Sequence, residues 1–191
     1  MRISKIAKVS LVTSLLISPF TAFSAEKIAK GTYSAQSGWV KTYETADLAN
    51  RTSPQQLGVY EIQLINTGWK DIPPRERKGI QRKITLKGVL LGVIDSQTFI
   101  ASHTMADINR QYVIRSEGDQ VLPTSGDPYC STGVPMTVRE QVNLTSATGA
   151  YANLAGGTLY FEGTVNNCPT DPEFGKNDLE VLPTMGEVVF N

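Results

Sequence analysis

Three ionisable side chains fall in step with apolar residues along segments that alternate between apolar and polar positions. They are His103, the single histidine of the 191 residues, Glu140 and Arg82. If the apolar faces are buried, an imidazole there could orient a ligand or transfer a proton. A buried carboxylate and guanidinium are costly unless paired, so Glu140 and Arg82 could face each other or a ligand. The sequence therefore predicts Arg82, His103 and Glu140 as candidate ligand-binding groups, and it assigns no catalytic residue.

Each candidate has a structural alternative that the sequence leaves open. His103 could be hydrogen-bonded in a core, and a single β-bulge would turn Glu140 or Arg82 towards solvent. No Cys or carboxylate accompanies His103 at ligand spacing in the sequence, so no metal site is predicted. Fingerprints for a nucleophilic serine, a phosphate-binding loop or a dinucleotide are absent as well, and no cofactor is expected.

The elements that must position these groups are strands, because a two-residue period dominates the chain. Eight strands are predicted, over residues 31–43, 60–64, 80–94, 99–105, 111–115, 136–144, 158–165 and 187–190. The third becomes apolar on both faces at Val89 and Leu91, which predicts burial on both sides. We expect an all-β fold, a closed antiparallel eight-stranded barrel of calycin-like type, with a β-sandwich as the alternative. Closure is favoured because it removes exposed strand edges and suits glycines within strands.

Residues 1–24 have the layout of a secretory signal peptide. A basic start is followed by an apolar stretch over 9–20, and Ala22 and Ser24 supply small residues before the cleavage site. An uncleaved anchor is the alternative, but the stretch is shorter than the roughly 20 residues of a spanning helix. We therefore predict a single exported domain, 25–191, that is periplasmic or extracellular and is not inserted in a membrane after cleavage.

The charge balance of the expected mature chain argues against nucleic acid as a partner. Residues 1–24 hold three of the 18 Lys and Arg, which leaves 15 against 18 Asp and Glu. A mildly acidic domain without basic clusters binds polyanions poorly, since neutralised phosphates supply most of that affinity.

Cys130 and Cys168 are the two cysteines of the chain, and in an oxidising compartment they predict a disulfide. If segments 136–144 and 159–165 pair as a hairpin, both cysteines lie just beyond its open end. A metal site or a catalytic thiol is the alternative, but CxxC spacing and a neighbouring histidine are missing.

The segment 148–159, TGAYANLAGGTL, resembles the glycine-rich signature of the allene oxide cyclase and dirigent-like barrels. Gly149, Tyr151, Leu154 and Gly156 match a pattern in which a strand leads into a turn and then into the next strand. Glycine permits the positive φ that a tight connection requires, while Tyr151 and Leu154 could plug a barrel end. The resemblance implies an eight-stranded antiparallel barrel whose interior holds a small apolar molecule. Cyclases, isomerases, dirigent proteins and bacterial secreted proteins share this fold, and none of the cyclase's catalytic residues aligns here by motif.

These observations predict an exported small-molecule-binding β-barrel protein for a largely apolar ligand. A cofactor-free cyclase or isomerase is the first alternative, and it requires Glu140, His103 or Arg82 within reach of a bound reactant. A secreted interaction protein with a packed barrel is the second. Whether the chain is an enzyme and whether it forms oligomers both stay open.

Overall fold

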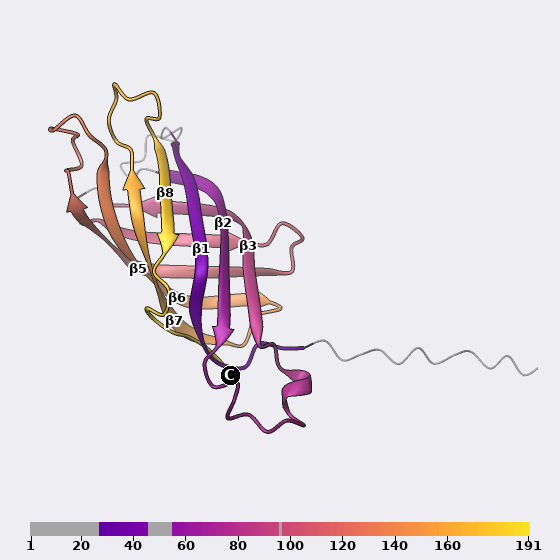
Figure 1. The fold of residues 1–191 in the computed structure, drawn as a ribbon. Helices are drawn as coiled ribbons and strands as arrows, with labels where there is room; N and C mark the ends of the chain where they lie inside the picture. The colour runs from indigo at the N-terminus through magenta and orange to yellow at the C-terminus, as the bar shows by residue number, and fades with distance from the viewer. Residues whose placement is uncertain (1–26, 46–54, 96) are drawn as a thin grey trace, which may run out of the picture.

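The computed structural model describes residues 27–45, 55–95 and 97–191 (Figure 1). The predicted signal peptide, 1–24, lies outside these residues. The regular elements of the described part are strands and one short 3-10 turn, η1 (Arg77–Gly79). The strands are β1 (Gly31–Thr45), β2 (Gln55–Asn66), β3 (Lys83–Ile94), β4 (Ile100–Ala106), β5 (Tyr112–Ser125), β6 (Met136–Gly149), β7 (Leu154–Val165), β8 (Lys176–Val181) and β9 (Val188–Phe190). No helix within the described ranges has the length and apolar character needed to cross a membrane.

The antiparallel sheet closes on itself because β1 pairs with β2 along one edge and with β8 and β9 along the other. Both β8 and β9 also pair with β7, at different heights, so these two short strands share one position around the barrel. The barrel therefore has eight positions, and the predicted fold class is confirmed.

Strand β8 is the element that the two-residue period did not predict. Its inward residues are Asn177, Leu179 and Val181. The first inward position holds Asn177, a polar residue, where the alternation would have an apolar one. Its amide donates to Thr42 Oγ1 at 3.2 Å. With two apolar positions in six residues, the alternation is too short to distinguish β8 from a loop.

The outer face of β3 corrects another prediction. The inward row from Ile84 to Leu90 is buried, as the alternation indicates, but Val89 and Leu91 are 43% and 46% exposed. They lie beside Val59 and Leu57 of β2, which are also exposed. Apolar residues on both faces of β3 thus reflect an apolar outer surface and not a strand covered on both sides.

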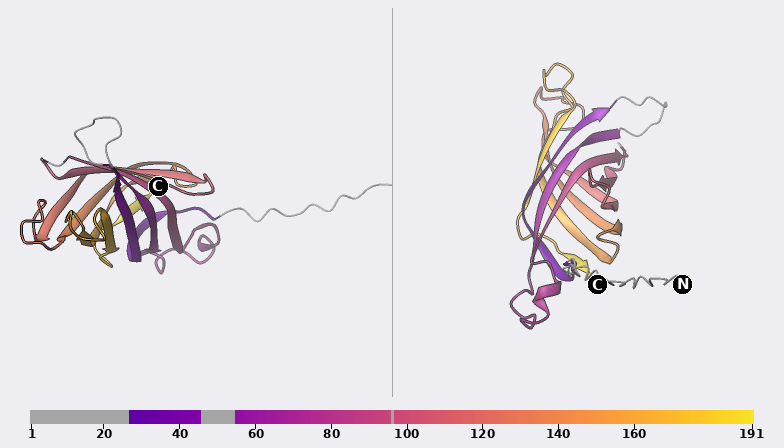
Figure 2. Two further views of the ribbon diagram at one scale, coloured as in Figure 1. Left: turned by 90° about the horizontal axis from the view of Figure 1, so that it is seen from above. Right: turned by 90° about the vertical axis from the view of Figure 1, so that its right-hand side faces the viewer.

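Aromatic side chains that pack on one another close one end of the barrel. The C-terminus of the chain lies at this end (Figures 1 and 2). This plug consists of Tyr33, Tyr60, Tyr112, Tyr151 and Phe190, all buried. The rings of Tyr112 and Tyr151 are 4.8 Å apart, and Tyr112 Oη accepts a hydrogen bond from the Lys87 backbone N–H at 2.7 Å. Burial in the plug raises the pKa of Tyr151 to about 12, so its hydroxyl is neutral at physiological pH.

The glycine-rich segment forms the β6–β7 connection at this closed end. Gly149 has a φ of 64°, and a side chain there would meet the Gln111 carbonyl oxygen at 1.9 Å. The turn carries Tyr151 into the plug, whereas Leu154 is half-buried against the core and Gly156 follows it in β7. The residues that carry the resemblance therefore build the barrel end.

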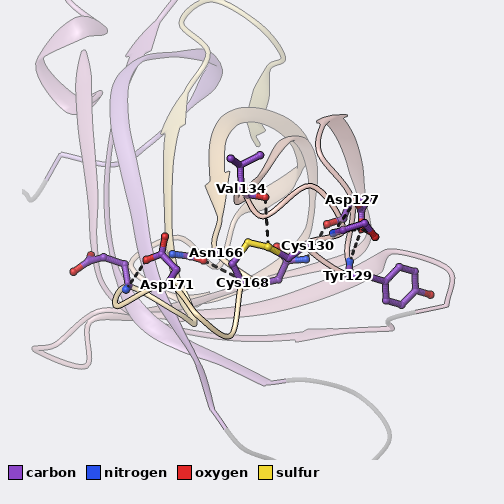
Figure 3. The surroundings of a disulfide bond; sticks show 10 residues. Asp127, Tyr129, Cys130, Val134, Asn166, Cys168 and Asp171 are labelled. Carbon is purple, nitrogen blue, oxygen red and sulfur yellow. Dashed lines mark hydrogen bonds between the residues drawn. A yellow bond between two sulfur atoms is a disulfide. The ribbon is translucent and has the colours of Figure 1, made fainter.

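The opposite end carries the β5–β6 and β7–β8 loops, which the predicted disulfide joins (Figure 3). The Cα atoms of Cys130 and Cys168 are 5.1 Å apart, just beyond the hairpin end at which Met136 pairs with Val165. The Asp127 carboxylate holds the first loop by accepting from the Tyr129 backbone N–H at 2.8 Å. A disulfide with Cys168 fully buried indicates a non-cytoplasmic location.

Candidate functional site

A cavity of about 630 Å³ opens at the disulfide end of the barrel. Its wall is built from inward side chains of the strands, mainly apolar, among them Ile94, Ala101, Val121, Val138, Val165 and Leu179. Its polar lining comes from Glu44, Gln56, Gln97, Tyr129, Asn167 and Glu140. The cavity is therefore an apolar chamber with a few polar groups, which is the usual composition of a small-molecule site.

His103 of β4 and Glu140 of β6 both point into the barrel, as their strand positions predict. They are 7% and 6% exposed, and His103 Nε2 lies 3.6 Å from Glu140 Oε1. Glu140 lines the cavity, whereas His103 lies behind it in the packed interior.

A β-bulge in β5 adds a second carboxylate that the sequence analysis missed. Tyr112, Ile114 and Ser116 point inward at even positions, but beyond Gly118 the inward residues are Asp119 and Val121. The registers with β4 and β6 both shift here, and Gly118 has a φ of 68°. One extra residue thus turns Asp119 into the interior, where it is fully buried.

Asp119 accepts hydrogen bonds from three directions. His103 Nδ1 donates to Oδ2 at 2.7 Å, and the Ser116 hydroxyl donates to the same oxygen. The backbone N–H of Asn143, which the bulge leaves without a ladder partner at this point, donates to Oδ1 at 2.7 Å. Because the carboxylate only accepts, Nδ1 of His103 carries a hydrogen and Nε2 faces Glu140.

Gly92 of β3 makes room for the imidazole. It pairs directly with His103 across the sheet, and a Cβ there would meet the ring Cδ2 at 2.9 Å. The same Cβ would meet Gln56 Oε1 at 3.2 Å. The missing side chain therefore lets the ring lie against the β3 backbone while it bridges the two carboxylates.

Burial and charge shift the proton affinities of the cluster formed by Asp119, His103 and Glu140. Burial lowers the pKa of His103, but the charge of Glu140 and the hydrogen bond and charge of Asp119 outweigh it, so the pKa is raised. Burial also raises the pKa of Glu140, and the nearby Asp119 charge adds to the effect, while the His103 charge opposes it. Both groups thus hold a proton more tightly than they do in water.

His103 and Glu140 influence each other's proton affinity, because Nε2 of the ring lies 3.6 Å from the Glu140 carboxylate. With Nδ1–H bound to Asp119, a neutral His103 would turn the Nε2 lone pair towards Glu140, which is favourable when Glu140 is protonated. A protonated His103 instead faces an ionised Glu140. Both arrangements carry the same net charge, but moving the proton from Glu140 to Nε2 turns a neutral pair into a buried ion pair, in which Asp119 also stabilises the charge of His103.

Arg82, the third candidate, is not in the lumen. It is exposed and lies in a bend directly before Lys83, the first residue of β3. The alternation that begins at Ile80 in the sequence therefore starts before the strand does. His103, and not Arg82, is therefore the cationic neighbour of Glu140.

The prediction of no metal site rested on the missing carboxylates near His103, and that premise is wrong in three dimensions. Ligand atoms of His103, Asp119 and Glu140 all lie within 4.8 Å of one another. Asp119 is engaged as a hydrogen-bond acceptor by His103 and Ser116. The bulge in β5 thus brings together three potential ligand groups that the sequence spacing did not indicate.

Fold and site together define a closed β-barrel with a ligand-sized cavity and a buried carboxylate–imidazole–carboxylate cluster in its wall. Comparison of the chain with protein families, with curated proteins and with solved structures finds no match. The resemblance to the allene oxide cyclase and dirigent-like barrels therefore stays a prediction from the glycine-rich segment.

Proposed function

We propose that this protein is an exported, small-molecule-binding β-barrel protein whose ligand is largely apolar. The observation that carries the proposal is the cavity of about 630 Å³, within the roughly 300–1,000 Å³ typical of small-molecule sites. Its apolar wall supports an apolar ligand, and Glu140 supplies a polar contact. The disulfide supports export from the cytoplasm. We propose that residues 1–24 are the signal peptide that directs this export.

A packed barrel acting only as an interaction protein has less support. That alternative requires a lumen filled by side chains. The aromatic plug fills only the closed end, and the cavity occupies the other.

Acid–base catalysis, as in a cofactor-free cyclase or isomerase of the allene oxide cyclase-like type, is the second candidate function. Glu140 favours it because its carboxylate lines the cavity and also adjoins His103. A proton given to or taken from a reactant by Glu140 could be exchanged with His103, whose orientation Asp119 fixes. A binding protein needs the cavity alone, whereas this candidate also needs that exchange.

Binding in the cavity is testable with the uncharged fluorophore N-phenylnaphthylamine, whose emission rises in apolar surroundings. We expect saturable enhancement with the wild-type protein. Ala101→Phe should reduce the affinity roughly tenfold or more, because Ala101 lines the cavity and the larger ring occupies it.

Ser102→Phe is the matched control, since Ser102 is the next residue of β4 and points outward. It should bind the fluorophore as the wild type does. Equal affinities for all three proteins, or no saturable binding to the wild type, would contradict binding in this cavity.

A further inference from the structure

Two polar groups that line the cavity, Glu140 and Asn167, have hydrogen-bond acceptors without a donor partner. Glu140 is 6% exposed, and among the described residues no donor forms a hydrogen bond with its carboxylate. The nearest cationic atom is His103 Nε2, at 3.6 Å, beyond hydrogen-bond distance. A carboxylate so buried and so weakly partnered has capacity for a donor from a ligand.

Asn167, on the β7–β8 loop, provides independent evidence. Its Nδ2 donates to the Asp127 carbonyl oxygen at 3.0 Å, which fixes the orientation of the amide. Its Oδ1 is buried and has no hydrogen-bond partner, and the residue lines the cavity. An unpaired buried acceptor is costly, and a donor on a bound ligand would remove that cost.

The charges of the lining have one sign. Glu44 and Glu140 are both lining residues, and the lining residues that the structure describes include no Lys, Arg or His. Behind the lining, the two carboxylates of Glu140 and Asp119 outnumber the one imidazole of His103, so an anionic ligand would add a desolvated negative charge beside a cluster that is already negative overall. A cationic donor would instead form a charge-assisted hydrogen bond, the stronger kind.

We propose that the ligand of this cavity is an apolar molecule with a protonated amine, and that Glu140 binds the ammonium group. This inference rests on the proposed ligand-binding function and narrows the ligand class. The apolar wall takes the hydrocarbon part, and the ammonium supplies the donors that Glu140 and Asn167 lack. The same charges weaken the binding of an apolar molecule that ends in a carboxylate.

Three probes of equal chain length test the head group: octylamine, octanol and octanoate, each titrated at pH 7 to displace N-phenylnaphthylamine from the wild-type protein. We expect octylamine to bind roughly tenfold or more tightly than octanol, and octanoate to bind more weakly than octanol. Glu140→Gln keeps the side-chain size and should remove most of the advantage of octylamine. Glu180→Gln, the same change on an exposed residue of β8, should leave it unchanged.

The outcomes separate this inference from the proposed function. Displacement by octanol together with octanoate binding as tightly as octylamine would keep the binding function and overturn the amine assignment. An advantage of octylamine that survives Glu140→Gln would overturn the role of Glu140. Failure of the fluorophore to bind at all would overturn the proposed function and the inference with it. The head-group series uses the wild-type protein, so the ligand class is tested even if Glu140→Gln does not fold.

Discussion

Asp119→Ala is expected to lower the free energy of unfolding by about 3–5 kcal/mol, the range for removing one partner of a buried ionic pair. Asp119 is fully buried and accepts from His103 Nδ1, the Ser116 hydroxyl and the Asn143 backbone N–H. Its loss leaves three buried donors unpaired beside a new void. Urea unfolding at pH 7, followed by far-UV circular dichroism, measures the change.

Asp178→Ala is the control for this prediction. Asp178 accepts from Lys41 Nζ at 2.9 Å, but both side chains are more than half exposed. Exposed pairs of this kind contribute about 0–1 kcal/mol. Equal losses for the two variants would show that burial does not distinguish the Asp119 cluster from an ion pair on the outer face.

Loss of the Cys130–Cys168 disulfide is the second large effect. The cysteines are 38 residues apart, and closing a loop of this length stabilises the folded state by about 4 kcal/mol in the chain-entropy model. We expect the urea midpoint to fall on reduction. The bridge also joins the loops that carry Tyr129 and Asn167, so fluorophore affinity should fall with it.

The double variant Cys130→Ala, Cys168→Ala should unfold at one midpoint with or without reductant, and that midpoint should match the reduced wild type. A reduced wild type as stable as the oxidised protein would contradict the prediction. Two freely alkylated cysteines in the unreduced protein, detected by intact mass, would contradict the bridge itself.

The barrel could be predicted because its inward residues alternate over long stretches. Ile84 to Leu90 of β3 and Met136 to Leu144 of β6 are examples, and the cysteines flank the hairpin that contains β6. The period does not report what covers the opposite face, so the exposed Val89 and Leu91 were expected to be buried. A local pattern fixes the inward face and leaves the outer surface undetermined.

The candidate site could be predicted only in part, for reasons of register. His103 and Glu140 lie in unbroken alternation and point inward. Asp119 is out of step with Ile114, and only the bulge at Gly118 brings it inward. A glycine inside a run of strand residues was the available signal for that bulge. Arg82 lies outside the lumen for a different reason: the alternation was extended to residues that precede the start of β3.

The central claim about the site is that the buried carboxylates of Asp119 and Glu140 raise the pKa of His103 between them. The most direct measurement is a pH titration of the His103 imidazole by NMR, since His103 is the one histidine of the chain. We predict a midpoint above the ordinary value of 6.5, and a lower midpoint in Glu140→Gln, where burial is opposed by Asp119 alone. A wild-type midpoint at or below 6.5, or one that Glu140→Gln leaves unchanged, would contradict the account.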